Sequence, residues 1–251
     1  MKKLYSRIGL CGLIAFLVSC GIDDYYYLNA VPVGNIQSSA SSVTINLPNI
    51  DLQQFYYFTN FTIYYRIYIS DIQELASLQL AQSVLTLINS TLSSDYFAIL
   101  PYTTANTENT QVGMSVSTLF RNYHVLGLED ISIEDVLDSS ARGRSITLDF
   151  LQIPGSIPYL QIGNTSYNLF RSNGSGIFNP LPDRYFVNSS QLNSGENAIS
   201  TINADVVNKD DSGPRYTYVS MYIVVTGIDN NFSPVYSIPT FIGIFLLPEA
   251  S

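Results

Sequence analysis

The chain has 251 residues, 46% of them hydrophobic, enough for one large domain or two small ones with a sizeable core. It carries 20 acidic against 11 basic residues, and this net charge of −9 disfavours binding to nucleic-acid phosphates and to anionic lipid head groups. Only 12% of the residues are charged, and the many Ser, Thr, Asn and Gln residues are typical of an exported β-protein.

The first 20 residues combine a basic start with an apolar run and a cysteine. Residues 1–7 read MKKLYSR, and residues 8–18 are uncharged and apolar. That run has the length of a signal-peptide core and is well short of the roughly 20 residues that span a bilayer. It ends in LVSC at 17–20. This arrangement resembles the lipobox of bacterial lipoproteins; an ordinary cleaved signal and an uncleaved anchor are the alternatives.

The lipobox resemblance implies cleavage before Cys20 and acylation of its thiol and new α-amino group. Residues 1–19 are then a signal peptide, 20–41 a lipidated tether and 42–251 the folded domain. The predicted partner is a membrane, reached through acylated Cys20. Gly21 after the cysteine, by resemblance to lipoprotein sorting rules, favours the outer membrane of the cell envelope. Signal removal leaves 8 basic and 20 acidic residues, a net charge of −12.

The cysteine count excludes several chemistries. Cys11 lies in the signal core and is discarded, and Cys20 is the predicted lipid site. The mature domain therefore has neither a free thiol nor a disulfide, which excludes thiol catalysis and zinc–thiolate sites. No cofactor is predicted.

Apolar alternation and β-branched or aromatic residues predict most of the strands. Residues 21–41, which include Tyr25, Tyr26 and Tyr27, form the predicted tether; these tyrosines either rest on lipid head groups or begin the first strand. The segment 215–227, RYTYVSMYIVVTG, is apolar on both faces, as a central strand should be. The predicted strands are 42–48, 58–70, 111–117, 145–153, 165–172, 215–227 and 235–248.

Two helices are predicted. The first covers 72–92, with Asp71 as N-cap, Glu74 in a capping box and apolar residues at spacings of three and four. The second is short and covers 132–137. Residues 173–214 are rich in Asn, Ser, Gly and Pro, which favours loops.

Two segments resemble strands of a fibronectin type III-like β-sandwich. FTIYYRIYIS, within 58–70, is similar to the third strand, and RYTYVSMYIVVTGIDNNFSPVYSIPTF is similar to the last two. The resemblance implies a mainly β, fibronectin type III or immunoglobulin-like sandwich in which 58–70 and 215–227 are neighbours in one sheet. Such modules have about 100 residues, so a large insertion is expected at about 71–214, containing the long helix.

Few residues suggest chemistry. His124 is the only histidine, so a Ser-His-Asp triad would have to use it. A half-buried ring in a strand or loop is the simpler interpretation. The acidic segment 129–138 contains five carboxylates that suit calcium or glycoside hydrolysis, but a solvated helix face also explains them. The acidic turns at 210–211 and 229–231 suit hairpin geometry. No catalytic, cofactor-binding or metal residue is predicted; the predicted site is lipidation at Cys20.

These observations predict a lipid-anchored cell-envelope lipoprotein that serves as a non-enzymatic interaction or structural module with an unknown protein or glycan partner. The first alternative is a glycan-binding or adhesin-like surface protein, which expects exposed tyrosines in the 173–214 loops. The second is a carboxylate-dependent hydrolase, which needs two carboxylates about 5–10 Å apart in a cleft.

Overall fold

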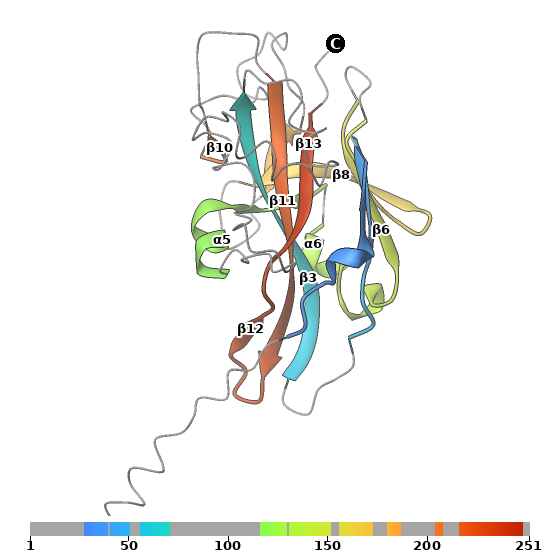
Figure 1. Ribbon diagram of the computed structural model, residues 1–251, viewed down its shortest axis with the longest axis vertical. Helices are drawn as coiled ribbons and strands as arrows, with labels where there is room; N and C mark the ends of the chain where they lie inside the picture. Colours follow the sequence, from blue (N-terminus) through green and yellow to red (C-terminus); the bar gives the residue numbers. More distant parts are fainter. Residues whose placement is uncertain are drawn as a thin grey trace, which may run out of the picture.

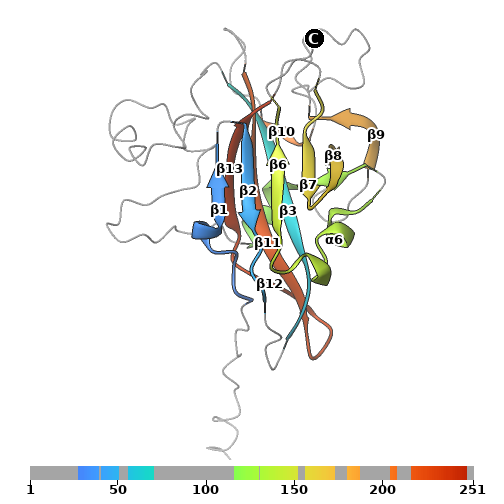
Figure 2. The same cartoon turned by 90° about the vertical axis from the view of Figure 1, so that its right-hand side faces the viewer.

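The described part of the chain is mainly β and forms two sheets that face each other in a sandwich-like arrangement (Figures 1 and 2). Both sheets contribute to one continuous apolar core. Among the described residues, no helix is long and apolar enough to cross a bilayer. The computed structural model describes residues 28–39, 41–50, 56–70, 116–129, 131–151, 156–172, 180–186, 204–207 and 216–247.

The first sheet is built around two long antiparallel strands, β3 (Tyr56–Ser70) and β11 (Tyr216–Asp229). Their register runs from Tyr216 opposite Ser70 to Asp229 opposite Tyr56, with one irregularity after Thr226. This confirms the prediction that 58–70 and 215–227 are neighbours in one sheet. The sheet is completed by β4 (His124–Val125), β10 (Val206–Val207), β12 (Pro234–Tyr236) and β13 (Thr240–Leu246).

The second sheet has the order β1-β2-β6-β7-β8-β5, with β9 also paired to β8. Its edges approach the first sheet: the Ser38 hydroxyl of β1 donates to the Ile242 carbonyl of β13 at 3.1 Å. Between the sheets, the rings of Phe150 and Phe245 stack with centroids 4.8 Å apart. The strands are β1 (Ile36–Ser38), β2 (Ser42–Asn46), β5 (Gly127–Leu128), β6 (Ser145–Asp149), β7 (Tyr159–Ile162), β8 (Thr165–Ser172) and β9 (Pro180–Tyr185).

The helix α5 (Val116–Asn122) lies beside the first sheet, on the side away from the second sheet (Figure 1). Phe120 of α5 packs on Tyr64 at 5.4 Å between ring centroids and on Tyr236 at 4.9 Å. Tyr123, just after α5, packs edge-on against Tyr222 at 5.2 Å. This cover explains why the central residues of β3 and β11 are buried on both faces.

The prediction of a strand over 111–117 is wrong at its two described residues, since Val116 and Ser117 begin α5. The apolar positions Val116, Leu119 and Tyr123 follow a helical spacing, and Leu119 and Tyr123 are buried. The short predicted helix is confirmed as α6 (Ile133–Val136), where the Ser132 hydroxyl accepts from the Glu134 N–H. The predicted helix at 72–92 lies outside the described residues.

Two stretches that the sequence assigns to a tether and to loops contain strands or core residues. Within the stretch assigned to the tether, Leu28 and Val31 are buried in the core, and β1 pairs with β2. Within 173–214, described residues form β9 and β10, so this stretch is not loop throughout. Two further short elements are the 3-10 helices η1 (Val33–Asn35) and η2 (Ser139–Ala141). The predicted strand 235–248 is interrupted between β12 and β13 at 237–239.

Gly227 marks a close approach at the end of β11. A Cβ atom there would lie 2.6 Å from the Tyr57 carbonyl oxygen and 2.9 Å from Leu28 Cδ1. Leu28 is buried and therefore rests on the β11 backbone beside β3. The first described residue of the chain is thus packed at the end of β11 that leads into the turn toward β12.

We expect Gly227→Ala to lower the free energy of unfolding by about 1–3 kcal/mol, because the Tyr57 carbonyl belongs to a paired strand and must shift. Gly34→Ala is the control, since no atom lies within 4 Å of a Cβ there; it should change stability by less than about 0.5 kcal/mol. Urea unfolding measures both. Equal stabilities of the two variants would contradict the close approach.

Candidate functional site

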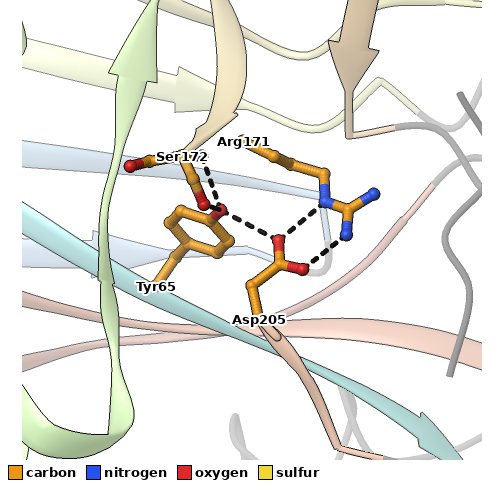
Figure 3. Close-up of polar contacts among 4 residues, drawn as sticks. All are labelled: Tyr65, Arg171, Ser172 and Asp205. Carbon is orange, nitrogen blue, oxygen red and sulfur yellow. Dashed lines mark hydrogen bonds and ion pairs between the residues drawn. The ribbon is translucent and has the colours of Figure 1, made fainter. Parts of the chain in front are cut away.

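The described residues contain a buried polar cluster of Tyr65, Arg171, Ser172 and Asp205 (Figure 3). Tyr65 lies in the middle of β3, in the first sheet. Arg171 and Ser172 end β8, in the second sheet. Asp205 directly precedes β10, and its carbonyl accepts from the Ile67 N–H at 2.9 Å. The cluster therefore joins the two sheets.

The residues of the cluster form a connected network of hydrogen bonds. Arg171 donates to both carboxylate oxygens of Asp205, from Nε at 2.8 Å and from Nη2 at 2.5 Å. The Tyr65 hydroxyl donates to Asp205 Oδ2 at 2.9 Å and accepts from the Ser172 N–H at 2.8 Å. This two-point contact between guanidinium and carboxylate is the strong geometry for such a pair.

The residues of the cluster are almost completely buried. Arg171 is 1% exposed, Tyr65 is fully buried and Asp205 is 4% exposed. Burial, and next the nearby Asp205 carboxylate, raise the pKa of the Tyr65 phenol well above its ordinary value of 10.0. The phenol therefore keeps its proton and remains a hydrogen-bond donor. With every member buried and bonded to another, the cluster acts as a polar cross-link between sheets.

His124 lies next to this cluster but does not join it. It belongs to β4, is 9% exposed, and its ring centroid is 6.0 Å from that of Tyr65. Its Nδ1 atom has no hydrogen-bond partner among the described residues. The ring is thus more buried than the half-buried position expected from the sequence. The other face of this region is closed by Phe186, packed edge-on against Tyr65 at 4.8 Å.

The four described carboxylates of the acidic segment 129–138 are bonded to neighbours or exposed, and Asp130 lies outside the described residues. Glu129 Oε2 accepts from the Asn168 side-chain amide at 2.5 Å. Asp138 caps η2: its Oδ1 accepts from the Ser140 N–H at 2.8 Å and hydroxyl at 2.7 Å, and these bonds lower its pKa. Glu134 and Asp135 are exposed. Among the described residues, no three His, Cys, Asp or Glu side chains gather in a way that holds a metal ion.

The acidic turn at 229–231 has the hairpin geometry that its sequence predicts. Asp229 Oδ1 accepts from the N–H groups of Asn231 and Ser233, both at 2.8 Å. The Asp229 N–H donates to the Ser233 carbonyl at 3.0 Å. The side chain of Asp229 thus shapes the turn between β11 and β12. The predicted lipid site Cys20 and the acidic turn at 210–211 lie outside the described residues.

Sequence reasoning missed Arg171 and Asp205. They are 34 positions apart, and they meet because β10 pairs with β3 and the two sheets pack face to face. One signal was available: Arg171 is the one charged residue in the strand TSYNLFRS, whose last four residues are buried. A charged residue inside a buried strand needs a partner of opposite charge.

No protein-family model, no curated protein and no solved structure matches the chain. The function must therefore be argued from the residues themselves.

We expect Asp205→Asn to lower the free energy of unfolding by about 3–5 kcal/mol, because it leaves the buried Arg171 guanidinium without its carboxylate.

We expect Tyr65→Phe to lower the free energy of unfolding by about 1–3 kcal/mol, since it removes one hydrogen bond to Asp205 and one to Ser172. Urea unfolding measures both.

The double variant Arg171→Met with Asp205→Leu is the matched control. It removes both charges together and should be more stable than Asp205→Asn alone. If Asp205→Asn unfolded within about 0.5 kcal/mol of wild type, as a neutral surface change does, the cluster would not be a cross-link.

Proposed function

We propose that this chain is a lipid-anchored lipoprotein of the bacterial cell envelope, held through acylated Cys20 and acting as a non-enzymatic interaction or structural module. The observation that carries the proposal is LVSC at 17–20 behind a basic start and an 11-residue apolar run. Stable attachment by acyl chains needs more than one chain, and a cysteine acylated on both its thiol and its amino group meets that need.

The start of the described fold supports this arrangement. Leu28 is buried in the core, eight residues after Cys20. Cleavage before Cys20 therefore leaves the described fold intact, because every described residue follows the cleavage point. The short stretch between Cys20 and Leu28 would hold the domain close to the membrane.

The finer fold assignment is also part of the proposal. We interpret β3 and β11 as the third and sixth strands of a fibronectin type III-like sandwich, which are neighbours in one sheet of that fold. Their long antiparallel register supports this interpretation. The stretch 71–214 is then the insertion, and several of its strands, including β6 and β8, extend the second sheet.

The state of the polar residues favours binding over catalysis. His124 packs on Tyr65, and the carboxylate of Asp205 is engaged by Arg171. Glu129 and Asp138 are engaged by their neighbours. A rigid two-sheet scaffold that carries polar loops is a common way to display a binding surface. A protein or glycan is the proposed kind of partner.

We expect labelled palmitate fed to the producing cells to be incorporated into the wild-type chain but not into Cys20→Ser. The wild type should partition into the detergent phase more than Cys20→Ser does, because the acyl chains supply the apolar surface. Cys11→Ser is the matched control: it loses the other cysteine of the chain, which lies in the signal core, and should behave as wild type. Label in Cys20→Ser, or equal detergent partition of the two proteins, would contradict the anchor.

We expect the purified mature protein to bind a component of envelope extracts or a glycan array saturably, and to turn over none of a panel of hydrolase substrates. Binding and product formation are measured on the same preparation. Turnover that is abolished by changing a pair of carboxylates would overturn the non-enzymatic assignment and favour the hydrolase alternative.

A further inference from the structure

Two exposed aromatic side chains lie at one end of the first sheet. Phe232 is 81% exposed and belongs to the turn between β11 and β12. Tyr57 is 54% exposed, is the second residue of β3 and lies opposite Ile228 of β11. Figure 1 shows that turn and the first residues of β3 at the same end of the molecule. We call Tyr57 and Phe232 the aromatic tip.

Phe232 is held outward by a well-bonded turn. Its backbone has φ of +62°, a left-handed conformation that Gly and Asn adopt readily and that is uncommon for a bulky residue. Its N–H donates to the Asp229 carbonyl at 3.0 Å, and Asp229 Oδ1 holds the N–H groups on either side. The chain thus places a phenylalanine where backbone strain and solvent exposure both disfavour one. Packing within the described fold does not explain that choice.

The aromatic tip is at the end of the domain nearest the predicted anchor. Leu28 rests on Gly227, two residues before β11 ends. The eight residues from Cys20 to Leu28 reach at most about 29 Å when fully extended. Tyr216, at the other end of β11, is eleven residues from Gly227, or about 36 Å along the strand. The stretch from Cys20 to Leu28 is therefore too short for that opposite end to meet the membrane with the strands upright.

Charge also favours this end. Between residues 228 and 236 the only charged side chain is Asp229, which is engaged within the turn. The mature chain as a whole is strongly acidic and is repelled by anionic head groups. Aromatic side chains, by contrast, are favoured at the membrane–water interface.

We propose that the aromatic tip contacts the lipid bilayer in which the acyl chains of Cys20 are embedded, so that the domain stands on the membrane with a defined orientation. The inference rests on the proposed acylation of Cys20. The anchor supplies attachment, and Phe232 and Tyr57 supply a second contact that fixes which end faces the lipid. The other end of β11, with Tyr216, is then turned away from the bilayer.

The absence of tryptophan from the chain allows a direct test. The full lipoprotein carrying Phe232→Trp is reconstituted into phosphatidylcholine vesicles whose acyl chains are brominated, which quenches tryptophan fluorescence at short range. The expected result is a loss of fluorescence relative to unbrominated vesicles. Ile238→Trp is the matched control, since Ile238 is exposed to 55% and its neighbour Ser237 bonds to Val225, farther from the turn. That variant should show no loss.

Quenching of Ile238→Trp as strong as that of Phe232→Trp, or no quenching of either, would overturn the orientation. Tyr57→Trp is a second reporter and should also be quenched; it decides the question if Phe232→Trp does not fold. Phe232→Gly relieves the left-handed backbone, so it should keep its stability while the Tyr57→Trp reporter in that background loses quenching. Palmitate labelling of the same preparations separates the two failures: unlabelled protein refutes the anchor, whereas labelled protein without quenching refutes only the tip.

Discussion

The pairing of β3 with β11 is the constraint on which the rest of the structure depends. The two strands share a register that spans nearly their whole length. The central residues of both strands are buried on both faces, so each face needs a covering layer. One face is covered by the second sheet and the other by α5 and Tyr123. In a domain without a predicted disulfide, this double cover must supply the stability that a covalent cross-link provides in many exported proteins.

The polar cluster explains how the two sheets are joined at a defined position. Apolar packing tolerates sliding of one sheet over another, because it is not directional. Tyr65 instead bonds to a particular N–H on β8 and to a particular carboxylate beside β10. Such a buried group adds little net stability over an apolar core, but disrupting one member is costly. The cluster therefore specifies the arrangement of the sheets more than it strengthens the domain.

The two ends of the first sheet differ in their structure. The end with Gly227 and Leu28 is tightly packed, carries the aromatic tip and is closest to the proposed lipid anchor. β10 pairs near the other end of β3, where Val206 lies opposite Ile67. In the function proposed for this chain, the scaffold holds one end at the membrane and presents the other to a partner.

The sequence by itself determined most of the strands, because these follow from the local spacing of apolar residues, and its resemblance to a fibronectin type III-like sandwich led to the partnership of 58–70 with 215–227. The sequence did not decide that Val116 begins a helix rather than ending a strand, since a short apolar stretch fits both. Tertiary structure alone decided the contact of Arg171 with Asp205 and the exposure of Phe232. The first joins residues distant in the chain, and the second depends on a turn that points away from every covering layer; neither is encoded in local hydrophobic pattern.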